Sequence, residues 1–244
     1  MSAMREEIAA LIDKIETTER VVKGMRTYYR GSLWGKDVVL VFSRWGKVAS
    51  ATTATHLIND FEVSEILFTG VAGAIEPSIN IGDVVIGEEL YQHDMDASPL
   101  VERFEVPLLR KKSFSSNTER NLILSNSIRE FLARKEEFIT SEQLAFFGIK
   151  NPKKVEGKIA SGDQFISDLQ TIDKIRKDLP GVLCVEMEGA AVAQVCYEYK
   201  LPFNIVRTIS DRADDNSHID FPRFATEVAS RYAQGIIEHY FNSI

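Results

Sequence analysis

The sequence predicts an α/β protein, built as one domain over residues 1–244, with three α/β/α layers around a central mixed, mainly parallel, twisted sheet. Two observations carry this prediction. Short apolar runs typical of buried strands alternate with segments of helical periodicity, as in sheets that helices cover on both faces. The chain is also 44% hydrophobic and 27% charged, which is enough for a full core, and it contains no repeat, low-complexity segment or obvious linker.

The first half of the chain is predicted to begin with a helix. Ser2 is its candidate cap, and its apolar residues recur at helical spacing: Met4, Ile8, Leu11, Ile12 and Ile15. Two strand-like runs, 25–29 and 37–42, flank glycine turns and predict a hairpin. The other elements expected in this half are a helix over 48–58 and strands over 65–68 and 83–87.

The second half continues the alternation. The expected helices are 117–137, 172–179, one that begins near Ala190, and a long amphipathic helix over 221–241. The expected buried strands are 155–160, 182–185 and 203–206. The piece from Thr140 to Lys154 has no clear periodicity and is interpreted as decoration, with a lid or an interface element as alternatives.

Composition and charge exclude several classes of protein. The 29 basic and 36 acidic residues give a net charge of −7, which argues against a nucleic-acid binder. Two cysteines in apolar surroundings, Cys184 and Cys196, suit a reducing cytosol and exclude a disulfide framework. The four histidines lack metal-ligand spacing, and no apolar run reaches membrane-spanning length. We therefore expect a cytoplasmic protein without metal, cofactor or membrane partner.

Candidate functional residues follow the predicted strands, where α/β sheets bind their ligands. The strand over 203–206 leads into Arg207 and Asp211, which form either a catalytic group or a solvated strand exit. The segment from Thr69 to Ala74 holds two glycines, three apart, that would let the backbone approach a ligand or would form a tight strand-to-helix turn. The polar stretch 91–96 is interpreted as a structural network, with a ligand site, a metal site or a solvated loop as alternatives.

Carboxylates lie in three separate parts of the chain: Glu7, Glu188 and Asp211. Taken alone, Glu7 is an ordinary acid in the first turn of a helix, where the helix dipole favours negative charge. With an aromatic residue, Phe165, and a glycine-rich loop, such carboxylates would suit cleavage of a sugar bond. One acid then protonates the leaving group, and another carboxylate activates water at the opposite face.

Eight segments carry a resemblance to a known family: AMREEI (Ala3–Ile8), GKV (Gly46–Val48), TGVAGA (Thr69–Ala74), GD (Gly82–Asp83), HDMD (His93–Asp96), ASGDQFI (Ala160–Ile166), VEMEGAAVAQVC (Val185–Cys196) and RTISD (Arg207–Asp211). In their order and spacing the chain resembles the methylthioadenosine/S-adenosylhomocysteine nucleosidases of the purine nucleoside phosphorylase superfamily. The resemblance implies a nucleoside phosphorylase-like fold. It also implies hydrolysis of the N-glycosidic bond of both nucleosides, which releases adenine and a 5′-thio-substituted ribose.

The resemblance further implies roles for single residues. Glu7 matches the base that activates water for attack on the ribose C1′, and Asp211 matches the acid that protonates adenine N7. Glu188 matches the carboxylate that grips the ribose hydroxyls. Phe165 matches the ring that stacks on adenine, and Arg207 matches an arginine near the catalytic Glu. The substrate-binding residues implied in this way are Val71, Ala72, Gly73, Phe165, Ile166, Met187, Glu188, Arg207, Ser210 and Phe221.

The chain departs from the family pattern in its N-terminal half. Only Met1 and Ser2 precede the AMREEI motif, where relatives have an apolar first strand. Val71 stands where some relatives have Ser, and Trp45 replaces a smaller aliphatic residue near the 5′ substituent. The family's habit of completing the 5′ pocket across a dimer predicts a homodimer, and the apolar loop from Pro99 to Pro107, with Leu100 and Phe104, is the expected contact.

Three other functions compete with this interpretation. A phosphorylase on the same fold would use phosphate in place of water and would need cationic or hydroxyl groups to hold it. A nucleosidase for futalosine-type nucleosides is a second alternative. A non-catalytic purine-binding protein is the third, and the retained Glu7, Glu188 and Asp211 argue against it.

Overall fold

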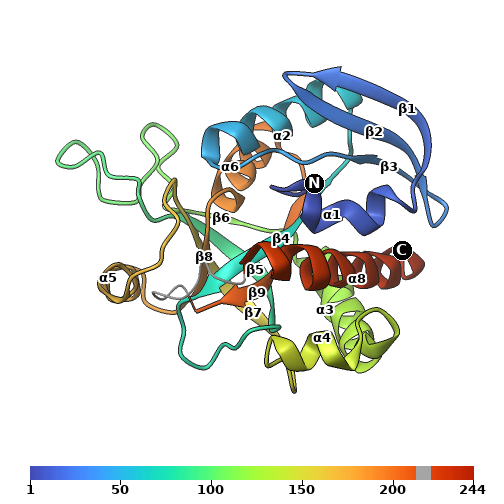
Figure 1. Cartoon of the computed structure of the whole chain (residues 1–244). Coiled ribbons are helices and arrows are strands. Elements are labelled where there is room, and N and C mark those ends of the chain that lie inside the picture. Colours follow the sequence, from blue (N-terminus) through green and yellow to red (C-terminus); the bar gives the residue numbers. More distant parts are fainter. Residues whose placement is uncertain (213–220) are drawn as a thin grey trace.

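The computed structural model in Figure 1 describes residues 1–212 and 221–244 and contains a six-stranded sheet. Its strands are β4 (Ile66–Ala74), β5 (Val84–Gln92), β6 (Ser113–Ser115), β7 (Lys154–Ser161), β8 (Val182–Glu186) and β9 (Phe203–Asp211). They follow the order β6-β5-β7-β8-β4-β9, and β9 pairs again with β5. The sheet therefore curls into a ring of five strands, with β6 at its edge.

The sheet is mixed, as the sequence predicts, but the expected three-layer, mainly parallel arrangement is not confirmed. Among the described strands, the pairs β4–β9, β5–β7 and β7–β8 are parallel, whereas β4–β8, β5–β6 and β5–β9 are antiparallel. Pairing between β5 and β9 joins segments that lie more than a hundred positions apart in the sequence. Local periodicity reports a strand but not its distant partner, so ring closure was not predictable from it.

A second, smaller sheet lies beside the N-terminal helix (Figure 1). It consists of β1 (Glu16–Lys23), β2 (Arg26–Leu33) and β3 (Lys36–Leu40), joined by antiparallel pairs. The predicted hairpin corresponds to β2 and β3, and β1 was missed. The β1 sequence ETTERVVK is exposed almost throughout, so it lacks the apolar alternation that indicates a half-buried strand.

Helices surround the ring (Figure 1). They are α1 (Arg5–Ile12), α2 (Lys47–Phe61), α3 (Thr118–Ala133), α4 (Ser141–Phe146), α5 (Leu169–Asp178), α6 (Gly189–Tyr199), α7 (Phe221–Phe224) and α8 (Ser230–Asn242). Helix α2 packs on α6, while α8 packs on α1 and α3. None of the described helices combines the length and the apolar character needed to cross a membrane.

The strands that end at the candidate site are longer than the sequence predicts. β4 continues through both glycines to Ala74, so the alternative of a tight strand-to-helix turn is wrong. β9 continues to Asp211 and is buried at every position, which excludes a solvated strand exit up to that residue. The two strands support each other, since Gly70 pairs with Arg207 and Gly73 pairs with Asp211. The sequence is mostly polar from Asp211 to Ser217, and residues 213–217 of this stretch lie outside the described residues.

The predicted C-terminal helix is confirmed as helical without a break over 221–242, although its local repeat changes within it. A π-helical turn, Ala225–Ala229, separates α7 from α8. The predicted apolar stripe is nevertheless confirmed as buried: Phe224, Val228, Tyr232, Ile236 and Tyr240. The π turn adds one residue to the local repeat, and such turns occur most often near functional sites.

The piece from Thr140 to Lys154 is part of the core. It contains α4, whose N-terminus is closed by a reciprocal pair of hydrogen bonds between Thr140 and Gln143. Leu144 and Ile149 are buried against residues of β5, α3 and α8. Packing of this kind is inconsistent with decoration.

The loop from Pro99 to Pro107 belongs to the segment between β5 and β6 that projects from the body in Figure 1. Leu100 is 89% exposed, as predicted, but Phe104 and Val106 are buried. The prediction that Phe104 offers apolar surface to a partner is therefore wrong. Its ring packs into a cluster with residues of β8 and α5, and the Arg103 guanidinium covers it at 4.5 Å.

Candidate active site

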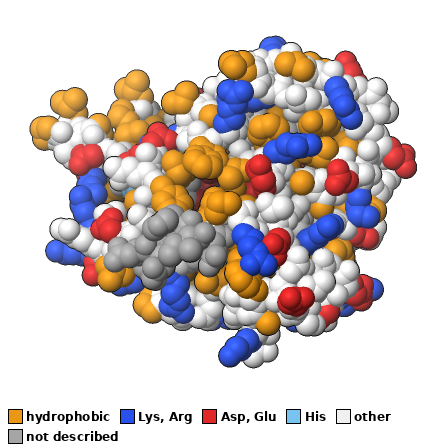
Figure 2. Space-filling model, viewed as in Figure 1, with side chains coloured by type: hydrophobic (Ala, Val, Ile, Leu, Met, Phe, Trp, Pro, Cys, Tyr) orange, Lys and Arg blue, Asp and Glu red, His pale blue; other side chains and the backbone are white. Residues whose placement is uncertain are grey.

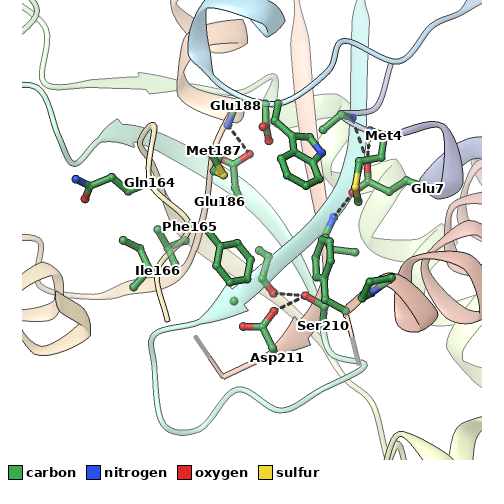
Figure 3. Close-up of a pocket in the computed structure, with 18 residues that line it drawn as sticks. Met4, Glu7, Gln164, Phe165, Ile166, Glu186, Met187, Glu188, Ser210 and Asp211 are labelled. Carbon is green, nitrogen blue, oxygen red and sulfur yellow. Dashed lines mark hydrogen bonds between the residues drawn. The ribbon is translucent and has the colours of Figure 1, made fainter. Parts of the chain in front are cut away.

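A cavity of about 350 Å³ lies where α1, β4, β8 and β9 meet (Figure 3). All the predicted catalytic and substrate-binding residues except Arg207 line it: Glu7, Val71, Ala72, Gly73, Phe165, Ile166, Met187, Glu188, Ser210, Asp211 and Phe221. These residues come from segments as far apart as α1 and α7. The fold therefore brings together side chains that the motifs named separately.

Glu7 is a buried carboxylate that the chain around it holds in place. One oxygen, Oε2, accepts hydrogen bonds from the amides of Ala3 (3.1 Å) and Met4 (2.9 Å) and from the Ser2 hydroxyl. The other, Oε1, accepts from the amide of Val71 at 3.0 Å. Ser2 thus binds the catalytic candidate, and Met4 takes the capping position that we expected for Ser2.

Burial has the largest influence on the Glu7 carboxyl and raises its pKa above the usual value, although the Ser2 hydroxyl, the Met4 and Val71 amides and the nearby Arg207 act in the opposite direction. A carboxylate with a raised pKa is a stronger base than an ordinary Glu. Glu7 thus lines the cavity as a buried carboxyl with a raised pKa, which makes it a candidate general base.

Arg207 lies behind the cavity wall. Its side chain is 1% exposed and forms an ion pair with Glu186, with Nη2 at 2.6 Å and Nε at 3.1 Å from Oε2. Gly70 lies between this group and Glu7, since a Cβ there would sit 3.0 Å from Glu7 Oε1 and 3.5 Å from Arg207 Nη1. Arg207 is therefore near the catalytic candidate, as the resemblance implies, and influences it through its charge.

Glu188 faces the cavity from the N-terminus of α6. Gly46 lies in the loop before α2, and its amide donates to Glu188 Oε1 at 2.8 Å. Burial and then the neighbouring Glu186 carboxylate raise the pKa of Glu188 well above the usual value. A carboxyl in this state can share protons with hydroxyl groups of a ligand, and a positive charge placed beside it would favour its ionised form.

Asp211 ends β9 on the other side of the cavity from Glu7 (Figure 3). The hydroxyl of Ser210 donates to its Oδ2 at 2.6 Å. Two acidic groups therefore flank the same space from opposite directions. That is the arrangement in which one group can act on a leaving group while the other acts on a nucleophile.

The walls between the carboxylates are apolar and aromatic. The rings of Phe165 and Phe221 meet edge to face with centroids 6.0 Å apart. Phe165 is 49% exposed and Trp45 is 63% exposed although both line the cavity, and hydrophobic side chains gather around the hollow in Figure 2. Flat rings at a cavity mouth suit a planar, weakly polar ligand such as a nucleobase.

Sequence reasoning missed several lining residues: Ala3, Met4, Gln164, Val185, Glu186 and Pro222. Most of them adjoin a predicted site residue, so adjacency within a motif was the available signal. Glu186 also lies in VEMEG, but the motif alone does not tell that both of its acids line the cavity.

Fold and site together define a class: an α/β protein whose curled sheet sets buried carboxylates around a pocket for a small planar ligand. The family model of the Phosphorylase superfamily matches residues 1–242, and the chain belongs to that family.

The chain is 32% identical, over 100% of its length and 97% of the relative's, to a 5′-methylthioadenosine/S-adenosylhomocysteine nucleosidase from Psychromonas ingrahamii. It is similar in structure to the nucleosidase of the same name from Neisseria meningitidis in complex with methylthio-immucillin-A. The TM-score is 0.86 at 31% identity, with 100% of this chain and 97% of that chain covered. A futalosine hydrolase of Helicobacter pylori gives a TM-score of 0.84 at 27% identity, with 100% and 96% covered.

Proposed function

We propose that this chain hydrolyses the N-glycosidic bond of 5′-methylthioadenosine and S-adenosylhomocysteine, releasing adenine and the 5′-thio-substituted ribose. The observation that carries the proposal is that Glu7 and Asp211 line the same cavity from different sides. Relatives that match the whole chain bear the name of this activity, which supports the same conclusion.

In the proposed reaction, Glu7 takes a proton from a water molecule that attacks the ribose C1′. Asp211 gives a proton to adenine N7, so that the purine leaves as a neutral molecule and not as an anion. As the bond breaks, positive charge develops on the ribose, and the cavity carboxylates stabilise it. Ser210 holds the Asp211 carboxyl in place through its hydroxyl.

The remaining predicted residues bind the substrate in this proposal. Phe165 stacks on adenine, and the Ile166 backbone reads the edge of the base. Glu188 grips the ribose hydroxyls, Met187 lies against the sugar, and Phe221 adjoins the 5′ substituent. The backbone of β4 at Val71, Ala72 and Gly73 closes the cavity floor.

Water, and not phosphate, is the proposed nucleophile because of the charges around the cavity. The lining includes Glu7, Glu186, Glu188 and Asp211, and no described lining residue is a Lys, Arg or His. The buried Arg207 is already paired with Glu186. Among the described lining residues, a phosphate ion would meet carboxylates and no cation, at a large electrostatic cost.

The test is incubation with methylthioadenosine in buffers with and without phosphate, with free adenine and the sugar product measured by chromatography. We expect equal rates and a free thioribose. Strict dependence on phosphate, with a ribose 1-phosphate product, would identify a phosphorylase. Futalosine serves as a second substrate in the same assay, and a clear preference for it would favour the alternative nucleosidase.

The proposal also includes one domain over residues 1–244, a cytoplasmic location and a homodimer. Because Phe104 is buried, the dimer contact is expected from Leu100 and from Leu108, which is 97% exposed. Analytical ultracentrifugation at micromolar concentration tests the assembly, and a fully active monomer would contradict it.

A further inference from the structure

Three motifs of the sequence, GKV, HDMD and ASGDQFI, contribute polar residues that meet beside the cavity. Lys47 Nζ lies 2.6 Å from Asp94 Oδ1, and the Asp163 amide donates to Asp94 Oδ2 at 3.0 Å. The Lys47 amide donates to Asp163 Oδ1 at 2.7 Å. Each of these residues thus contacts the other two, and together they form a closed triangle.

The triangle joins segments that carry different parts of the cavity lining. Lys47 follows Gly46, whose amide holds Glu188, and Trp45, which lines the cavity. Asp163 precedes the stretch from Gln164 to Ile166, all of which lines the cavity. Asp94 follows the end of β5 and is absent from the cavity lining, so its contact with both other segments gives it a linking position.

We propose that Lys47, Asp94 and Asp163, named the clasp, are positioning residues that fix the base-binding wall at Phe165 relative to the sugar-binding wall at Glu188. This inference rests on the proposed function, because the two walls are defined by the substrate. It assigns a purpose to three motifs that the catalytic residues leave unexplained.

Sterics and charge support the clasp. Gly46 has a φ of 93°, and a Cβ there would lie 2.9 Å from Asp163 Oδ1, so the close approach of the two segments requires glycine. Burial would raise the pKa of Asp94, but the Lys47 hydrogen bond and the Asp163 amide outweigh it and lower that pKa. The carboxylate therefore stays ionised at neutral pH and keeps both hydrogen bonds.

The chain offers a matched control. Lys154 and Glu156 form an ion pair at 2.5 Å with side chains 15% and 29% exposed, against 17% and 25% for Lys47 and Asp94. This control pair lies near the start of β7, at the opposite end of the strand from Asp163. Burial would likewise raise the pKa of Glu156, but the hydrogen bonds to Lys154 and Ser125 outweigh it and lower that pKa.

The experiment compares Lys47→Met with Lys154→Met, and Asp94→Asn with Glu156→Gln, by urea unfolding, kcat and KM on methylthioadenosine, and adenine affinity by calorimetry. Both members of each comparison should lose similar, small amounts of stability. Only the clasp variants should lose activity, by about tenfold or more in kcat/KM, because small misplacements of a site cost rate steeply. The double variant Lys47→Met with Asp94→Asn should lose little more than the worse single one, since either change opens the triangle.

A rescue series separates positioning from structure. Asp163→Asn keeps an oxygen that can accept from the Lys47 amide and should stay near wild type, whereas Asp163→Ala should resemble Lys47→Met. If kcat/KM of the clasp variants stayed within about twofold of that of their controls, the inference would be overturned, because misplacement of the site predicts a larger loss. A wild-type protein that binds adenine without releasing it from methylthioadenosine would contradict the proposed function alone, and adenine affinity of the variants would then decide the clasp. A wild-type protein that neither binds adenine nor releases it from methylthioadenosine would overturn both the proposed function and the clasp.

Discussion

Glu186 and Glu188 lie two positions apart in one motif, yet the structure gives them opposite environments. The Glu186 carboxylate accepts hydrogen bonds from Arg207, from the Ser161 hydroxyl and from the amides of Glu188 and Gly189. Among the described residues, the Glu188 carboxylate accepts from the Gly46 amide. The partners of Glu186 at the start of α6 thus compensate its negative charge, whereas Glu188 has a carboxylate oxygen that can bind a ligand.

The difference teaches that burial of an acid does not by itself indicate catalysis. Both side chains are almost equally inaccessible, at 7% and 6% exposed. What separates them is the number and charge of their partners: Arg207 and a helix N-terminus make the buried charge of Glu186 tolerable. Glu7 and Asp211 resemble Glu188 in this respect, because they also line the cavity and the ion pair of Arg207 is formed with Glu186.

The largest expected effect is catalytic. Asp211→Asn cannot deliver a proton and Glu7→Gln cannot accept one, so each should lower kcat on methylthioadenosine by roughly 10²–10⁴-fold. Ligand binding and the melting temperature should largely survive. Steady-state kinetics and melting curves of both variants check this. A folded Asp211→Asn with near wild-type kcat would remove Asp211 from the role of acid.

The next effect is structural. Glu186→Gln leaves Arg207 as a buried cation without its counter-ion and should cost about 3–5 kcal/mol of unfolding free energy. Urea unfolding of Glu186→Gln beside Glu188→Gln measures the contrast, and we expect the second variant to be at least as stable as wild type. Equal losses in the two variants would abolish the distinction between the two acids.

A smaller catalytic effect is expected for Glu188→Gln. The amide can still bond to ribose hydroxyls but cannot stabilise the developing cation, so kcat should fall and KM should rise, each by about tenfold. Separate determination of kcat and KM with methylthioadenosine tests this. A change confined to KM would restrict Glu188 to binding the ground state.

The smallest effect is the pH dependence of stability. The pKa of Glu188 is raised on folding, so above its usual value of 4.5 the folded protein holds a proton that the unfolded chain has released. Stability should therefore fall as the pH rises from 4.5 towards the folded-state pKa, and level off above it. Glu188→Gln should show a shallower fall across this window in urea titrations at several pH values. Parallel curves for wild type and variant would contradict the raised pKa.

Much of the site was predictable because its motifs are local. TGVAGA, ASGDQFI, VEMEG and RTISD each named residues that line the cavity. The interpretation of the polar stretch 91–96 as a structural network agrees with the contacts of Asp94. Strand β1 was not predictable because its exposed sequence lacks apolar alternation. The burial of Phe104 and the ion pair of Glu186 with Arg207 were not predictable because they depend on segments farther away in the chain.

The sequence by itself determined the α/β alternation, the family and the chemical identity of the reacting groups. Apolar periodicity and short motifs are properties of neighbouring residues, and they are readable without a structure. Tertiary structure decided the closure of the sheet, the direction of Arg207 and which acid of VEMEG pairs with that arginine. Pairing of β9 with β4 and β5 and the ion pair between Arg207 and Glu186 fix those outcomes. Such pairings are chosen by the free energy of the whole core, which no short stretch of sequence contains.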